Sequence, residues 1–284
     1  MGIYFRGWSI IEEFLSTNNF VDLNSIIEEF SNLRPRRFTS DSKYVEIMFS
    51  LCKKEKLSIL RPLLQELEDK NLQDENKFTL LHCAAQHGNI EIVKYLFPLV
   101  NDKLPISGPR TYSNGFTVDK ETPLHLAARK GHLSVIDFMV HQLKNGDMNP
   151  ALGDGRTVLH RAAYYGHLNV VSFYTSRLDN PNPGKVSNDD FRGRTPLHFA
   201  AQQGHLEVVK HFCNLLQDKN PCDDYGYTVL HSAASKGHID IVKYLVQFVD
   251  NKHPEAGDYW NYRTPLNLAK DNGKTKVVDF LKNQ

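Results

Sequence analysis

The sequence predicts an all-α solenoid, that is, a linear stack of short helix-turn-helix units joined by hairpin loops. The first observation is a segment that occurs six times in similar form, with copies beginning at Thr79, Thr122, Thr157, Thr195, Thr228 and Thr264. The second is the helical spacing of apolar residues inside each copy. The third is the Pro-, Gly-, Asn- and Ser-rich composition between copies, which is typical of loops. One copy has too little apolar area to fold alone, so we expect the copies to share a continuous core.

The fourth copy shows how one unit is expected to fold. It reads TPLHFAAQQGHLEVVKHF over Thr195–Phe212. Thr195 can cap the first helix with its hydroxyl, and Pro196 suits the first helical turn because an N–H would have no partner there. Gly204 is expected to end that helix in the left-handed conformation. Apolar residues at helical spacing after Gly204 then predict a second helix with one buried face.

The pattern that the copies share, T-P-L-H-x-A-A-x-x-G-H, resembles the ankyrin repeat. The resemblance covers residues 74–284 strongly and residues 1–73 weakly. We interpret 74–284 as six repeats, and the repeat that begins at Thr264 as a polar C-terminal cap. We interpret 1–73 as a helical N-terminal cap with one or two degenerate repeats. The two parts are expected to form one continuous solenoid.

The N-terminal part carries two weaker patterns. The hexapeptide SIIEEF occurs at Ser9–Phe14 and again at Ser25–Phe30, and each copy begins with a capping box, so a helical hairpin is expected. Residues 44–67 align with the repeat, but Glu55 stands in place of the glycine, so the inner turn is expected to differ. The basic turn Arg34–Arg37 can be a localisation signal or a solvated loop, and we favour the loop.

Histidines recur at two positions of the repeat. They are His82, His125, His160, His198 and His231 at the fourth position, and His132, His167, His205 and His238 after the glycine. A metal site is an alternative, but the glycine between the two positions breaks the helix, so the two rings do not share a helical face. The resemblance implies that the first histidine bonds backbone groups in the turn. We therefore expect structural histidines, with no metal and no cofactor.

Composition limits the classes of partner. Lys and Arg number 34 and Asp and Glu 33, which gives a net charge of +1 and no overall field that favours nucleic acid or an anionic membrane. Cys52, Cys83, Cys213 and Cys222 show no metal-ligand spacing and too little density for a disulfide scaffold, which indicates a reducing compartment. The sequence contains no membrane-spanning run. A cytoplasmic monomer is expected, with the nucleus as the alternative location.

No catalytic pattern is evident. Gly273–Thr275 has the end of a phosphate-binding loop, but Leu268 stands where that loop requires its first glycine. The chain is therefore predicted not to be an enzyme.

One modification is suggested by the resemblance alone. Ankyrin repeats resemble substrates of asparaginyl hydroxylation at a hairpin asparagine, and Asp147-Met148-Asn149 fits that pattern loosely. Pro150 after Asn149 departs from it. Hydroxylation of Asn149 is therefore a hypothesis that intact mass measurement can test.

The resemblance implies that a partner contacts the hairpins and the two variable residues before each glycine. Tyr, Trp and Arg are frequent there, and these types dominate interface hot spots. The alternative is that the rings stack on neighbouring hairpins and only stiffen the array. The predicted partner-binding residues are Phe78, Arg129, Lys130, Arg156, Tyr164, Tyr165, Phe191, Arg192, Arg194, Gln202, Gln203, Tyr225, Tyr227, Lys236, Trp260 and Arg263.

The expected function is non-catalytic binding of a protein or peptide on the concave surface formed by the hairpins and inner helices. The arginines favour a partner with carboxylates or phosphates. The alternative is a cytosolic ankyrin domain of a larger assembly, or a regulatory scaffold subunit in one, such as a channel, a signalling complex or a pathogen effector.

Overall fold

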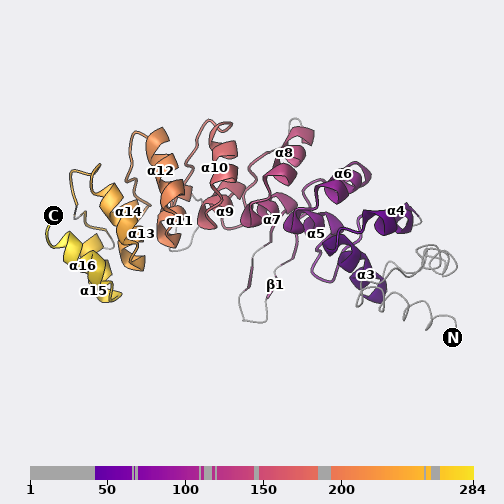
Figure 1. Ribbon diagram of the computed structural model, residues 1–284, viewed down its shortest axis with the longest axis horizontal. Coiled ribbons are helices and arrows are strands. Elements are labelled where there is room, and N and C mark those ends of the chain that lie inside the picture. Colours follow the sequence, from indigo (N-terminus) through magenta and orange to yellow (C-terminus); the bar gives the residue numbers. More distant parts are fainter. Residues whose placement is uncertain are drawn as a thin grey trace. The chain divides into compact units, whose positions relative to one another are not determined.

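The computed structural model describes residues 42–65, 67, 70–108, 110–111, 117–118, 120–143, 147–184, 193–252, 254–256 and 263–284 (Figure 1). Within these ranges the chain forms fourteen helices and one two-stranded ladder. The helical hairpin predicted from the two SIIEEF segments and the basic turn Arg34–Arg37 lie outside the described residues. The predicted all-α repeat architecture is confirmed.

The chain divides into two compact units. The first comprises residues 1–126 and 137–143, and the second comprises residues 127–136 and 144–284. The boundary falls within helices α7 (Pro123–Lys130) and α8 (Leu133–Gln142). Continuity of a single solenoid across this boundary stays a prediction.

The first unit begins with the degenerate repeat, whose helices are α3 (Ser42–Lys53) and α4 (Leu57–Gln65). The expectation that Glu55 would change the inner turn is wrong. Glu55 adopts φ +59°, a left-handed conformation that costs a non-glycine residue energy. The N–H of Lys56 donates to Leu51, as the equivalent N–H of Asn89 donates to Ala84 in the next repeat. The turn geometry is therefore kept although its glycine is lost.

The first clear repeat follows as α5 (Leu80–His87) and α6 (Ile90–Leu99). After it comes the segment of residues 104–118, which lies between two copies of the repeat and was therefore expected to be a loop. Part of this loop pairs as an antiparallel ladder of β1 (Arg110–Thr111) with β2 (Thr117–Val118), in the register Arg110 to Val118 (Figure 1). This segment therefore contains a short antiparallel ladder, which its composition did not predict.

The second unit contains four complete repeats. Their helices are α9 (Val158–Tyr164), α10 (Leu168–Thr175), α11 (Pro196–Gln203), α12 (Leu206–Leu215), α13 (Val229–Lys236), α14 (Ile239–Leu245), α15 (Pro265–Asp271) and α16 (Thr275–Leu281). Within this unit the first helices α9, α11, α13 and α15 form one row, and the second helices form another (Figure 1). The paired alanines Ala200 and Ala201 are fully buried, so neighbouring first helices approach closely.

The ends of the first helices follow the predicted chemistry. The Thr228 hydroxyl accepts from the backbone N–H of His231, which satisfies one orphan donor of α13. Gly237 ends the same helix at φ +85°, in the left-handed region. Thr79 caps α5 in the same way. Among the described helices, none is long and apolar enough to cross a bilayer.

Candidate functional site

The fourth-position histidine of each repeat joins its own helix to the next hairpin. In His198 the ring nitrogen Nδ1 accepts from the backbone N–H of Thr195 at 3.2 Å. The proton must therefore lie on Nε2, which donates to the carbonyl of Tyr227 in the next repeat at 3.0 Å. The same bond runs from His82 to Glu121 and from His231 to Arg263. The implied bond of this histidine to turn backbone is confirmed.

The histidine after the glycine bonds in the opposite direction, to the preceding repeat. His205 Nε2 lies 2.9 Å from the carbonyl of Tyr164, and His238 Nε2 lies 2.9 Å from that of Gln202. These carbonyls belong to the variable residues at the end of the preceding first helix. The first histidine therefore holds the backbone of the next hairpin, and the second holds the backbone of the variable residues before the preceding glycine. These are the two places at which a partner is expected. Groups of three metal-binding side chains do not occur among the described residues.

These buried histidines predict that the folded chain loses stability in mild acid. Burial lowers the pKa of His198 from the ordinary 6.5 to about 3 and that of His231 to about 4. The unfolded chain therefore takes up protons below pH 6.5 that the folded chain does not accept until near pH 4. The free energy of unfolding should therefore decrease as the pH is lowered from 6.5 to about 4, by up to about 1.4 kcal/mol per pH unit for each histidine.

Urea unfolding at pH 7 and pH 5, followed by circular dichroism, measures this loss. The wild-type midpoint should be lower at pH 5. The variant His231→Asn should show a smaller difference between the two pH values, because one of the two proton-linked groups is gone. Equal wild-type midpoints at both pH values would contradict the assignment of neutral buried rings.

The residues before the glycines form an aromatic and basic surface, which we call the inner-helix surface. It consists of Arg129, Lys130, Tyr164, Tyr165, Gln202, Gln203 and Lys236. Tyr165 is 37% exposed and its ring meets Tyr164 edge-on at a centroid distance of 5.0 Å. The Tyr164 ring in turn packs against the Phe199 ring, with ring centroids 6.1 Å apart. The guanidinium of Arg129 lies 6.0 Å from the centroid of the Tyr165 ring. Lys130 and Lys236 are exposed.

The predicted hairpin residues divide into buried and exposed groups. The prediction that Phe78 contacts a partner is wrong, because this residue is only 3% exposed. Its ring stacks on Phe49 and His82 in the core of the first unit. Tyr227 is half-buried and packs edge-on against His231, whereas Tyr225 is 39% exposed. Stacking therefore accounts for Phe78 and Tyr227 but not for Tyr225. Phe191, Arg192 and Trp260 lie outside the described residues.

The described hairpin arginines are all engaged by acidic side chains of the chain itself. Arg194 Nε donates to the buried carboxylate of Asp223 at 3.1 Å, which links one hairpin to the next. Arg156 pairs with Asp154, and Arg263 pairs with Asp271. These pairings depend on side-chain contacts that the sequence alone did not show, and a role of these arginines in partner binding stays a prediction.

Comparison with known families decides the identity of the fold. A family model of ankyrin repeats matches three stretches of the chain, residues 47–149, 106–177 and 177–258. The chain belongs to the ankyrin repeat family. The first matched stretch begins within α3 and includes α4, so it covers most of the degenerate repeat, whose sequence departs from the repeat pattern.

Curated relatives of this ankyrin repeat chain include three palmitoyltransferases. The chain is 36% identical to palmitoyltransferase ZDHHC17 of Homo sapiens and of Rattus norvegicus over 101 residues, and 34% identical to putative palmitoyltransferase ZDHHC13 of Danio rerio over the same length. The match covers 34% of this chain and 13% of each relative. This chain therefore spans only a small part of the length of these relatives.

Three asparagines cap the first helices of these ankyrin repeats, a role that the sequence analysis did not predict. They are Asn149, Asn182 and Asn220, whose side-chain oxygens accept from the N–H groups of Leu159, Leu197 and Leu230 at 3.0, 3.1 and 2.9 Å. Each is followed by proline and preceded two residues earlier by Asp or Asn. That short pattern was the available signal. Hydroxylation of Asn149 stays a hypothesis.

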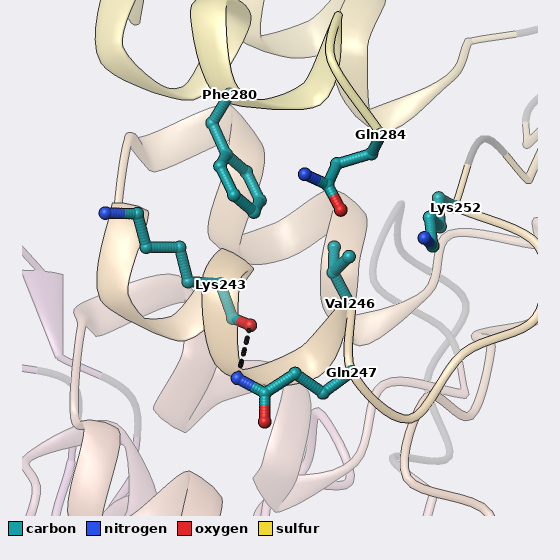
Figure 2. A pocket seen from close by; sticks show the side chains of 6 residues that line it. All are labelled: Lys243, Val246, Gln247, Lys252, Phe280 and Gln284. Carbon is teal, nitrogen blue, oxygen red and sulfur yellow. Dashed lines mark hydrogen bonds between the residues drawn. The ribbon is translucent and has the colours of Figure 1, made fainter.

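A pocket lies apart from the inner-helix surface, between α14 and α16 (Figure 2). It has a volume of about 480 Å³ and is lined by Lys243, Val246, Gln247, Lys252, Phe280 and Gln284. The amide of Gln247 donates to the carbonyl of Lys243 at 3.2 Å, and the Lys243 ammonium lies 5.9 Å from the centroid of the Phe280 ring. These side chains offer no nucleophile paired with a base, and none belongs to the predicted binding set.

Proposed function

We propose that the inner-helix surface binds a segment of a partner protein in extended form and that no reaction occurs on it. The observation that carries this proposal is the exposed ring of Tyr165, whose neighbour Tyr164 is held by the bond from His205. Exposed aromatic rings on a fixed backbone supply contact area at low entropic cost. The proposal includes a monomeric, cytoplasmic chain without catalytic activity of its own.

The charges of this surface favour an acidic partner. Lys130 and Lys236 are exposed and form no ion pair with the described residues, unlike Arg194 in the hairpins. The surface from α7 to α13 contains no acidic member. Because its lysines flank the tyrosines and glutamines, carboxylates near the two ends of a bound segment would be attracted, with an apolar or aromatic residue between them.

The spacing of the repeats limits the length of that segment. Lys130 and Lys236 lie three repeats apart, and helices pack at roughly 10 Å. The distance is therefore about 30 Å, and an extended chain advances about 3.3 Å per residue. A segment of about nine residues would span the two lysines.

Selection from a displayed library of random nonapeptides tests the proposal with the full chain as bait. Selected peptides should carry Asp or Glu near both ends and an aromatic or aliphatic residue in the middle. In fluorescence anisotropy with a labelled selected peptide, Tyr165→Ala and the double variant Lys130→Glu/Lys236→Glu should each weaken binding about tenfold or more.

Two matched variants serve as controls, because they change the same chemistry elsewhere. Phe248→Ala removes another exposed ring, 44% exposed, and Lys276→Glu reverses an exposed charge on α16. Both should leave affinity within about twofold. If the Tyr165 and lysine variants bind selected peptides as tightly as wild type, at unchanged helicity, the inner-helix surface is not the site.

A second candidate function is supported by the relatives. The chain covers 13% of their length, so this ankyrin array can also serve as the protein-recognising segment of a larger protein or as a scaffold subunit. Immunoblotting of an extract from the native source tests this candidate. A single band near 32.5 kDa that elutes as a monomer in size-exclusion chromatography would exclude it.

A further inference from the structure

Two buried thiols, Cys52 and Cys83, lie where α3 packs against α5. The sulfur of Cys52 lies 3.7 Å from the carbonyl oxygen of Leu80, and the sulfur of Cys83 lies 3.8 Å from that of Phe49. Each carbonyl belongs to the residue three positions before the other cysteine. These reciprocal contacts place the Cys52 and Cys83 side chains at the same point of the contact between α3 and α5.

An imidazole completes the cluster. His87 Nδ1 lies 3.8 Å from the Cys83 sulfur, and the His87 side chain is exposed. The neighbouring Cys52 thiol lowers the pKa of Cys83, burial opposes this shift, and His87 and Lys53 reinforce it. Interaction with Cys83 in turn raises the pKa of Cys52 and that of His87. The cluster therefore favours one thiolate at Cys83 beside one thiol at Cys52.

We propose that Cys83 and Cys52 form an oxidation site at which hydrogen peroxide converts the two thiols into a disulfide that joins α3 to α5. The inference is independent of the peptide-binding proposal. A disulfide here would connect the degenerate repeat to the first clear repeat, across a sequence separation of 31 residues.

The reaction balances in two steps. The Cys83 thiolate attacks one peroxide oxygen, the O–O bond breaks, and the leaving hydroxide takes a proton to become water, which leaves a sulfenic acid on Cys83. The Cys52 sulfur then attacks the Cys83 sulfur. The S–O bond breaks, and the hydroxyl leaves as water with the Cys52 proton. The two sulfurs lose two electrons, which reduce the peroxide to water.

The other two cysteines provide internal controls. Cys213 is buried like the pair, but burial raises its pKa to about 11, and its sulfur lies 4.0 Å from the carbonyl oxygen of Lys219. Cys222 is exposed. Because Cys52 and Cys83 are buried, the peroxide reaches them through local opening of the contact between α3 and α5, so the pair should react more slowly than the exposed Cys222.

Peptide mapping of the full chain tests the proposal. The native protein is treated with hydrogen peroxide, its remaining thiols are blocked, and it is digested without reductant. A linked Cys52–Cys83 peptide, two hydrogens lighter than the sum of its parts, should accumulate while Cys213 stays reduced. In Cys52→Ser the linked peptide should vanish and dimedone should label Cys83. In His87→Ala formation of the linked peptide should slow about tenfold.

The proposal fails if native protein yields no linked peptide even after prolonged treatment that oxidises Cys222 completely. It also fails if the linked peptide forms only in urea, since the folded geometry then plays no part. If dimedone labels Cys213 in native Cys52→Ser as fast as Cys83, the thiolate assignment is wrong. Circular dichroism of each variant before treatment verifies that the helices have formed.

Discussion

Replacing His198 with alanine is expected to lower the free energy of unfolding by about 3 kcal/mol. The ring is fully buried, and its two nitrogens bond the backbone of Thr195 and of Tyr227 in different repeats. Truncation leaves a cavity and strands the Tyr227 carbonyl and the Thr195 N–H without this partner. Because stacked repeats stabilise one another, the loss should also reduce the cooperativity of unfolding.

Urea unfolding monitored by circular dichroism provides the measurement, and His211→Ala is the matched control. His211 is half-buried on α12 and forms a side-chain bond to Thr175 at 2.9 Å. Its loss should cost about 1 kcal/mol or less. If the two variants lose equal stability, the hydrogen bonds of His198 between repeats do not add to stability. The loss of an imidazole would then explain both results.

The sequence predicted the parts of the fold that short segments determine. A threonine cap, a left-handed glycine and apolar spacing act within one repeat, so a pattern seen six times was sufficient to place Thr228 and Gly237 correctly. The turn at Glu55 shows the limit of this reasoning. There the packing of α3 and α4 overrides an unfavourable residue, and that packing is not visible in the local sequence.

The candidate site was less predictable because it depends on which residues of different repeats meet. The arginines and aspartates of the hairpins were visible in the sequence, but their pairing across repeats, such as Arg194 with Asp223, depends on variable loop lengths. Phe78 occupies a hairpin position like that of Tyr227 and is nevertheless covered by Phe49 of the degenerate repeat. The inner-helix surface was easier to predict, since residues before each glycine share one place in the repeat.

The histidine bonds explain how a surface of variable residues can remain fixed. The carbonyls of Arg129, Tyr164 and Gln202 each accept from a histidine of the following repeat. The side chains of these residues are not needed for the bond, so their identity can vary while their backbone stays in place. Preorganised backbone of this kind reduces the entropy lost when a partner binds.

Gly166→Ala is expected to lower the free energy of unfolding by about 4 kcal/mol. Gly166 has φ +77°, which strains any residue with a side chain. A Cβ at this position would also lie 2.4 Å from Nδ1 of His205, far inside contact distance. The imidazole must move, and its bond to the Tyr164 carbonyl would be lost with it.

Gly273→Ala separates these two effects. Gly273 has φ +65°, but a Cβ there would meet nothing within 4 Å, so only the backbone strain of about 1 kcal/mol remains. The free energies of unfolding of the two variants, measured in urea, should therefore differ by several kcal/mol. Gly166→Ala also displaces His205, which holds the Tyr164 backbone in place, so it should lower the affinity for a selected peptide. Gly273→Ala should leave that affinity unchanged. Equal losses in the two variants would mean that the left-handed conformation alone fixes the glycine and that the close approach of His205 contributes nothing.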